Sequence, residues 1–450
     1  MTTADSHSSN EEALVVAWIA ANLGGEVTAV SRQARWRPAW FVDVRLRDGA
    51  DLHLYVRGER TDMAPIFALE HEWHIQQLLY DNNIPVPRVY GFCEHPKAIV
   101  MERVYGSVDF RDHTDDERDS VMEHYAEILA RMHSLELAPF VRMGVEQPRV
   151  DGDAARTGML AYERAYRSTK RRPDPYMEFC LRWLARNPPA HRVRPAIVVW
   201  DSGQIMHRDG RVVALLDLEL AHIGDALMDL AGLRMRDTVI GYGDLREFYR
   251  TYERAGGHPV DLDAIDYYHF AFTFTTQLAL HRALADPTPE SDLMNYMQWC
   301  SETNLYALES LAQFTGVALA EVEMPEPRPS PVSIAHRHLV NSLRAIEAND
   351  ELAAYQQRIA FRLARHLDRF NEIGPIVVDR DLDDLAALLG QRPPSWQEGE
   401  AALERFVLDA GREHDAALIA LFNRRLHRQR MLLGPPGSAM TAHLPLRPLR

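Results

Sequence analysis

The sequence predicts an α+β protein in which a small β-rich part precedes a larger and mostly helical part. Three observations lead to this fold class. Short runs of alternating apolar and polar residues are concentrated before residue 105, whereas helical spacing dominates after Gly106. A chain of 450 residues with 46% apolar side chains is also too long for one compact core, so we expect two or three domains.

Charge and cysteine usage exclude several classes of partner and compartment. The formal net charge of −15 repels nucleic acids and anionic lipids, and no apolar run approaches the roughly 20 residues needed to cross a bilayer. We therefore expect neither a nucleic acid nor a membrane as partner. Cys93, Cys180 and Cys300 are too widely spaced to suggest disulfides or a zinc site, so a reducing, cytoplasmic location is predicted.

The first elements are a leader, a helix and a hairpin. Residues 1–10 are polar and predict a flexible leader, and residues 11–23 carry apolar side chains at helical spacing. Residues 40–46 and 52–56 alternate in polarity on either side of the Asp48-Gly49 turn signal, which predicts an antiparallel hairpin.

A helix and a second pair of strands complete the β-rich part. Residues 67–79 have a helical pattern, a rigid Pro85-Val86-Pro87 segment follows, and residues 88–93 and 98–104 resemble strands. This part is expected to span residues 11–105.

The remainder of the chain is predicted to be helical, with one interruption. Residues 121–135 and 176–185 are expected helices, and two short β-rich pieces lie between residues 197 and 218. Together they define a second part over residues 106–324.

Four alternating prolines over residues 325–332 predict an extended linker, because each proline ring removes a backbone donor. Amphipathic patterns over residues 352–370 and 403–426 then predict a helical domain at residues 333–434, followed by a flexible tail at 435–450.

Three polar residues stand out between the apolar strand-like pieces: Asp201, Gln204 and Asp217. Because Asp209-Gly210 is a hairpin turn signal, the flanking strands should bring Gln204 and Asp217 to the same end of a β-ribbon. A carboxylate and an amide oxygen suit a hard cation such as Mg²⁺, whose other ligands would be waters and phosphates. The pattern therefore favours magnesium and nucleotide chemistry.

Several segments in fixed order resemble the aminoglycoside phosphotransferase family, which also includes choline and hydroxyacid kinases. The similar segments are Glu70-His71-Glu72-Trp73, residues 83–89, residues 99–104 and Leu216-Asp217-Leu218-Glu219, and the resemblance covers about residues 10 to 325. It implies a bilobal protein-kinase-like fold with an N-lobe at 11–105 and a C-lobe at 106–324 that carries the catalytic and metal loops. The implied cofactors are ATP or GTP with Mg²⁺.

The resemblance implies a role for each of Asp201, Gln204 and Asp217. Asp217 would ligate the magnesium that bridges the nucleotide phosphates, and Gln204 stands where the family has a metal-binding asparagine. Gln204 could equally close the loop by a hydrogen bond, and Asp217 could be a turn carboxylate. Asp201 would be the catalytic carboxylate that accepts or orients the proton of the attacking hydroxyl.

The catalytic loop departs from the family pattern. Where the family has His-Gly-Asp, this chain has Val199-Trp200-Asp201, and the loop to Gln204 is two residues shorter. A shorter loop keeps Asp201 in the site, whereas an ungapped alignment would place Val199 at the position of the base. Asp225 and Asp229 are expected to organise this loop by accepting backbone hydrogen bonds.

Nucleotide contacts in the N-lobe are implied by the same resemblance. Arg57 stands where a strand lysine contacts the phosphates, and Glu72 matches its helix partner, with a surface ion pair as the alternative for both. Glu102 and Val104 bound the expected hinge, whose backbone would hydrogen-bond adenine. The corner at residues 31–38 lacks the glycine of a phosphate loop but contains three arginines, which either bind an anion or form a solvated basic loop.

Two functions follow from these residues. The first is an ATP- and Mg²⁺-dependent small-molecule kinase with an atypical catalytic loop, which phosphorylates a hydroxyl of a hydroxyacyl thioester, another metabolite or an aminoglycoside-like antibiotic. The second is a catalytically impaired pseudokinase that acts as a nucleotide-responsive or scaffold protein. The helical domain at 333–434 is a candidate for docking on the C-lobe, for covering the cleft or for forming a homodimer.

Overall fold

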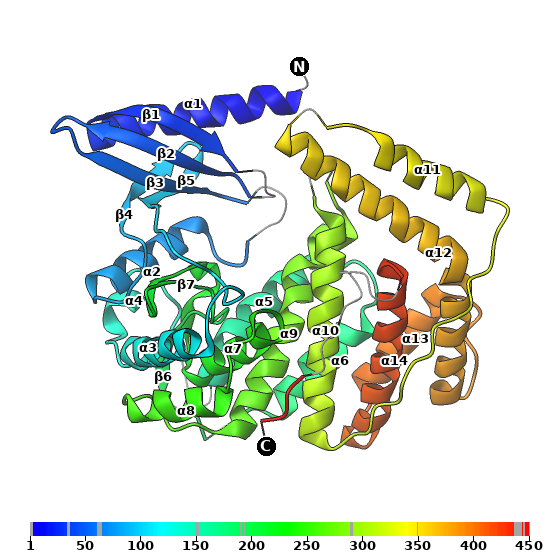
Figure 1. The fold of residues 1–450 in the computed structure, drawn as a ribbon. Helices are drawn as coiled ribbons and strands as arrows, with labels where there is room; N and C mark the ends of the chain where they lie inside the picture. Colours follow the sequence, from blue (N-terminus) through cyan, green and yellow to red (C-terminus); the bar gives the residue numbers. More distant parts are fainter. Residues whose placement is uncertain are drawn as a thin grey trace. The chain divides into compact units, whose positions relative to one another are not determined.

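The computed structural model describes residues 3–33, 37–60, 65–148, 153–189, 191–192, 194–288, 291–348, 350–435, 443 and 446–449 (Figure 1). The chain forms two compact units. The first unit contains residues 1–158 and 190–261, and the second contains residues 159–189 and 262–450. These units differ from the predicted division at residues 105 and 325.

A five-stranded antiparallel sheet opens the first unit, with strand order β1-β2-β3-β5-β4. Its strands are β1 (Gly25–Arg32), β2 (Ala39–Leu46), β3 (Asp51–Gly58), β4 (Val89–Glu94) and β5 (Lys97–Glu102). The predicted hairpin is confirmed, because β2 pairs with β3 in antiparallel register across the Asp48-Gly49 turn. The predicted helix is α2 (Leu69–Asp81), between β3 and β4.

Helix α1 (Thr3–Leu23) precedes the sheet and begins earlier than the sequence predicts. The expected flexible leader at residues 1–10 is instead helical from Thr3. The apolar pattern of α1 serves packing, because Val15 and Ile19 are fully buried in one cluster with Trp40 of β2. Burial of these side chains holds α1 against the sheet.

Short ribbons and helices complete the first unit. They are α3 (Asp115–His133), α4 (Ala138–Arg142), β6 (Pro195–Val198), β7 (Ile205–Arg208), β8 (Arg211–Leu215), β9 (His222–Asp225), α7 (Leu227–Ile240) and α8 (Leu245–Arg254), with the 3₁₀ turns η1 (Asp153–Ala155) and η2 (Leu218–Leu220). Strand β6 pairs with β9, and β7 pairs with β8. These two ribbons carry the polar residues singled out in the sequence.

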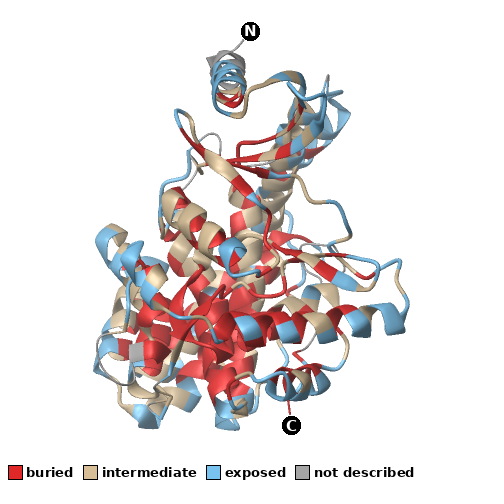
Figure 2. Cartoon of the chain, turned by 90° about the vertical axis from the view of Figure 1, so that its left-hand side faces the viewer, coloured by how far each residue is buried: buried red, intermediate tan, exposed pale blue. Residues whose placement is uncertain are grey.

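The second unit is helical. It comprises α5 (Thr157–Thr169, from Met159 onward), α6 (Pro175–Arg186), α9 (Leu262–Ala285), α10 (Leu293–Thr315), α11 (Ser333–Ala345), α12 (Glu351–Leu389), α13 (Trp396–Asp409) and α14 (Asp415–Leu433), with the 3₁₀ turn η3 (Arg412–His414). Across the described residues of the whole chain, buried positions gather in the interior of the helical regions and exposed positions mark the outer turns (Figure 2). Residues 316–332 have no regular structure, in agreement with the predicted linker.

Two predictions for the C-terminal region differ from the structure. The long pattern at 403–426 is not one helix, because α13 ends at Asp409 and α14 begins at Asp415, with Gly411 between them. The residues after 333 also do not pack as a separate domain. Phe422 of α14 packs its ring against Tyr176 and Phe179 of α6, with centroids 5.4 Å apart in each pair, so both belong to one core.

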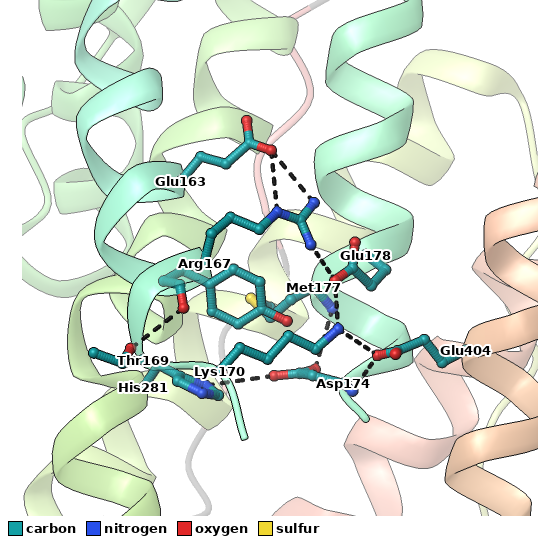
Figure 3. A network of polar contacts seen from close by, with 10 residues as sticks. Glu163, Arg167, Thr169, Lys170, Asp174, Met177, Glu178, His281 and Glu404 are labelled. Atoms are coloured by element: carbon teal, nitrogen blue, oxygen red, sulfur yellow. Dashed lines mark hydrogen bonds and ion pairs between the residues drawn. The ribbon is translucent and has the colours of Figure 1, made fainter. Parts of the chain in front are cut away.

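An ion-pair network links α5, α6 and α13 in the second unit (Figure 3). The Glu178 carboxylate is buried and accepts from Arg167 and from Lys170, whose Nζ lies 2.5 Å away. Lys170 also donates to Glu404 at 2.6 Å, and the same carboxylate accepts from the Asp174 backbone amide. Side chains more than 200 positions apart in sequence are thereby tied together.

Two exclusions from the sequence can be compared with the structure. Cys93, Cys180 and Cys300 are free and buried, so none of the three forms a disulfide. Of the helices that the structure describes, none combines the length and the apolar character needed to cross a membrane.

Candidate active site

The β7-β8 ribbon brings Gln204 and Asp217 to the same end, as the turn signal predicts. Ile205 pairs with Leu215, and the Leu216 amide donates to the Gln204 carbonyl at 2.8 Å. Asp217 follows directly in a left-handed backbone conformation, with φ of 58°. Such a conformation is unfavourable for most non-glycine residues and is concentrated at functional sites.

The Gln204 side chain joins the two candidate carboxylates. Its Nε2 donates to Asp201 Oδ2 at 2.7 Å and to Asp217 Oδ2 at 3.2 Å. Asp201, Gln204 and Asp217 therefore form one polar cluster, which we call the amide-carboxylate cluster. In this orientation the amide nitrogen faces the carboxylates, so the group would have to turn over to offer its oxygen to a metal.

Asp201, and not Val199, carries the acidic group of the short loop into this cluster. Val199 is buried in the core, whereas the Asp201 carboxylate contacts Gln204. The backbone reverses at Trp200, whose φ is 61°, at the position where the family pattern has glycine. The Asp201 carboxylate therefore reaches the amide-carboxylate cluster.

Residues outside the loop hold it in place. Asp229 of α7 accepts from the Val199 amide at 3.0 Å and from the Trp200 amide at 2.7 Å, which is the supporting geometry expected for this residue. The Tyr125 hydroxyl accepts from the Gly203 amide at 2.9 Å. Gly232 lets α7 approach closely, because a Cβ atom at this position would lie 2.0 Å from the Trp200 carbonyl oxygen.

Asp225 also has a supporting geometry. Its carboxylate receives Nε and Nη2 of Arg192 at 2.8 and 3.0 Å, and it accepts from the Leu227 amide at 3.0 Å. The Arg192 pair joins the end of β9 to the segment before β6, and the Leu227 contact joins it to the start of α7.

Arg236 is a neighbour of the cluster that the sequence reasoning did not identify. Its Nε and Nη2 donate to Asp201 Oδ1 and Oδ2 at 2.7 and 2.5 Å, a bidentate pair. The signal was its spacing: Arg236 lies seven residues after Asp229, two helical turns on, and so on the same face of α7. Burial alone would lower the pKa of Arg236, but the charge of Asp201 outweighs it and raises the pKa.

Arg57 of β3 and Glu72 of α2 are buried and paired, so they are not a surface ion pair. The Nε of Arg57 lies 3.0 Å from Glu72 Oε1, and Nη2 contacts Asp217. Burial raises the pKa of Glu72 despite the nearby arginines. Burial also opposes ionisation of Asp217, but the charges of Arg57, Arg37 and Arg236 dominate and lower the pKa of this carboxyl.

Glu219 and Arg37 extend this ion-pair group. Arg37 comes from the glycine-free corner and its side chain is only 2% exposed. It contacts Glu219, two residues after Asp217, and lies 3.8 Å from Glu72. Arg35 of the same corner lies outside the described residues.

The predicted hinge residues lie at the end of the sheet. Glu102 is the last residue of β5 and its side chain is exposed, while Val104 follows outside regular secondary structure. The Glu102 amide donates to the Arg88 carbonyl at 2.8 Å, and the Arg103 amide donates to the His53 carbonyl at 3.0 Å. The Arg103 side chain adds contacts of its own, because its Nη2 donates to Asp43 Oδ1 at 2.5 Å and its guanidinium lies over the Phe41 and Tyr105 rings.

The donor atoms of the cluster suit a hard cation. Within the described parts of the chain, no three His, Cys, Asp or Glu side chains gather as a metal cage. Gln204 and Asp217 could supply an amide and a carboxylate oxygen, and Mg²⁺ usually binds to one or two such protein groups, with waters and phosphates as the remaining ligands. The Arg57 guanidinium now contacts Asp217, so it would have to release this carboxylate to a metal.

Comparison with known proteins places this site within a recognised family region. The family model described as "Phosphotransferase enzyme family" matches residues 43–268, which is just over half of the chain. The match includes Arg57, Glu72, Asp201, Gln204 and Asp217.

Relatives and a solved structure are similar over part of the chain. "Acyl-CoA dehydrogenase family member 11" of Rattus norvegicus is 27% identical over 181 residues, 37% of this chain and 23% of that protein. The Homo sapiens protein is 27% identical over 177 residues, 36% of this chain and 22% of that protein. These matches thus span less than a quarter of the length of the relatives.

The structural comparison concerns the fold alone. A Ralstonia eutropha protein assigned as an aminoglycoside phosphotransferase is 18% identical, with a TM-score of 0.51. The likeness covers 68% of this chain and 98% of that chain.

Proposed function

The chain belongs to the phosphotransferase enzyme family, and on this premise we propose that it is an ATP- and Mg²⁺-dependent kinase that phosphorylates a hydroxyl group of a small molecule. The observation that supports this proposal most directly is the amide-carboxylate cluster, in which one Gln204 amide group donates to both Asp201 and Asp217. Phosphoryl transfer depends mainly on positioning and on charge neutralisation, and this cluster supplies oxygen ligands beside buried cations.

The proposed roles divide the cluster into a metal side and an acceptor side. Asp217 and Gln204 would hold Mg²⁺, which when bound would neutralise charge on the phosphate oxygens. Arg57, fixed by Glu72, would bind phosphate oxygens through its planar fork. The backbone between Glu102 and Val104 would contact the adenine ring.

Asp201 has the capacity to receive the acceptor hydroxyl. An ionised carboxylate offers about four lone-pair sites, and Arg236 and Gln204 together donate three hydrogen bonds to it. One lone pair of Oδ1 is left after these bonds. Arg236 fixes the direction of the carboxylate, so Asp201 would orient the hydroxyl and take up its proton as transfer proceeds.

For the acceptor we propose a hydroxyacyl thioester. The relatives carry acyl-CoA dehydrogenase in their names and extend well beyond the matched region. A phosphotransferase region attached to acyl-thioester chemistry is most useful if it acts on the same class of molecule. Other hydroxylated metabolites and aminoglycoside-like antibiotics serve as comparison substrates.

The test is a phosphoryl-transfer assay with the full chain, MgATP and a panel of hydroxyacyl thioesters, read by mass spectrometry. We expect a product heavier by one phosphoryl group. Asp201→Asn should lower kcat about 100- to 10,000-fold because it removes the proton acceptor but keeps the shape of the side chain. Asp209→Asn is the matched control, since Asp209 lies in the exposed β7-β8 turn.

The outcomes separate the kinase from the pseudokinase. Transfer that is lost in Asp201→Asn but retained in Asp209→Asn supports the kinase. If the parent binds MgATP but transfers phosphate neither to a panel member nor to water, the pseudokinase is favoured. If the parent does not bind MgATP, both nucleotide functions are wrong.

A further inference from the structure

Arg37 is a buried cation in a segment where the family pattern expects backbone amides. It lies between β1 and β2 in a corner that has no glycine at residues 31–38. Its side chain is 2% exposed, although a buried guanidinium is costly unless it is paired. Arg37 is therefore a buried, paired residue of the site and does not belong to a solvated basic loop.

Arg37 and Arg57 share two carboxylate partners. Glu72 lies 3.8 Å from Arg37 and 3.0 Å from Arg57. Glu219 contacts Arg37 and lies 3.6 Å from Arg57 Nη2. The backbone fixes this convergence, because the Gly58 amide, directly after Arg57, donates to the Pro38 carbonyl, directly after Arg37, at 2.8 Å.

The carboxylates around these arginines differ in exposure. Glu72 is buried at 4%, so it is a permanent partner that keeps both guanidinium groups inside. Asp217 and Glu219 are 27% and 26% exposed, so they form the solvent-facing side of this ion-pair group. An anion that reaches the arginines must take over contacts that Glu219 now makes.

On the basis of the proposed nucleotide-dependent reaction, we propose that Arg37 and Arg57 form a twin-guanidinium site for the polyphosphate of the nucleotide, with Glu219 as its internal competitor. Two planar forks can bind phosphate oxygens in bidentate fashion and so replace the backbone amides of a glycine-bearing loop. Recognition of the polyphosphate then depends on side-chain charge, which makes it sensitive to single substitutions and to salt.

Isothermal titration calorimetry of the full chain can test this site without any reaction. The probes are MgATP, inorganic tripolyphosphate in EDTA, and adenosine, which has no phosphate. Arg37→Gln should weaken binding of both phosphate probes about 10- to 100-fold, because it removes a charged hydrogen-bond donor. Adenosine binding should be unchanged. Arg45→Gln is the control, since Arg45 is a solvent-exposed arginine of the same sheet.

Glu219→Gln provides an independent variant that retains Arg37. It should tighten tripolyphosphate binding several-fold, because it removes the competing negative charge. If circular dichroism shows that Arg37→Gln does not fold, the Glu219→Gln variant tests the inference by itself. Unchanged or weaker tripolyphosphate binding by Glu219→Gln would then overturn the inference.

Failure of the inference can be distinguished from failure of the proposed function. Equal binding of MgATP by the parent and Arg37→Gln would reduce Arg37 to a structural partner of Glu219 and leave the kinase proposal intact. A parent that binds none of the nucleotide probes would overturn the proposed function itself.

Discussion

Single residues at this site are defined by the groups that oppose their charge. Arg57 is buried, and burial alone would lower its pKa, yet Asp217, Glu72 and Glu219 surround it and raise the pKa well above its ordinary value. The same pairing lowers the pKa of Asp217. Both groups are thus held ionised at any physiological pH, as the proposed binding of phosphate and metal would require.

His222 gives the residue-scale prediction, for the dependence of stability on pH. Burial lowers its pKa to about 4, and its Nδ1 is engaged with the Leu220 carbonyl at 2.9 Å. Asp229 favours its protonated form and His71 opposes it, but burial outweighs both. Since the unfolded chain takes up a proton near pH 6.5, stability should fall as pH decreases from about 6.5 to about 4.

Replacement of His222 should make the free energy of unfolding less dependent on pH. In urea titrations between pH 6 and pH 4.5, His222→Gln should reduce the slope of unfolding free energy against pH by about 1 kcal/mol per pH unit. Other histidines titrate in the same range, so the comparison is between slopes and not between absolute stabilities. An identical slope in parent and variant would show that His222 does not provide this dependence.

At the scale of elements, one arginine of α5 contacts a carboxylate of its own helix and a carboxylate of α6 that is much more buried. Glu178 and Glu163 both contact Arg167, but the Glu178 side chain is 1% exposed and that of Glu163 is 28% exposed (Figure 3). They therefore form a natural pair for measuring what burial adds to an ion pair.

Glu178→Gln should destabilise the second unit by about 1 to 3 kcal/mol, because it leaves Arg167 and Lys170 without their shared partner. The cost stays below that of a fully buried pair because Arg167 is itself partly exposed. Glu163→Gln, the control, should cost no more than about 0.5 kcal/mol. Thermal and urea unfolding measure both, and equal costs would contradict the assignment.

At the scale of the whole molecule, the proline-rich linker is not a domain boundary in the packing sense. Helices α12 to α14 follow the linker in sequence but share a unit with α6, α9 and α10, which precede it. The rings of Tyr176, Phe179 and Phe422 meet in this shared core.

A chain that ends at residue 324 should therefore lose part of the core of the second unit. It would expose the apolar faces of α6 and α10, so we expect a lower thermal midpoint and aggregation by light scattering. Phe422→Ala is the milder variant and should cost about 3 to 5 kcal/mol. A truncated chain that stays monomeric and unfolds like the parent would instead support an independent domain at 333–434. Homodimerisation through that region stays a prediction.

Local patterns were sufficient for much of the fold and for part of the site. Alternation and the Asp48-Gly49 signal predicted β2 and β3, and the Asp209-Gly210 signal predicted the ribbon that joins Gln204 to Asp217. These features depend on neighbours in sequence, whose geometry follows from backbone preferences. The leader was misjudged because a polar composition does not prevent helix formation when an apolar stripe further along is packed against a sheet.

The sequence by itself determined the fold class, the order of β2, β3, α2, β4 and β5, and the identity of the acidic and amide residues in the cluster. Only the tertiary structure decided that Arg236 holds Asp201 and that Arg37 and Arg57 share Glu72 and Glu219. It also decided that the C-terminal helices complete the core of the second unit. The physical reason is that ion pairs and buried faces join residues tens to hundreds of positions apart, and no local spacing encodes which partner will meet which.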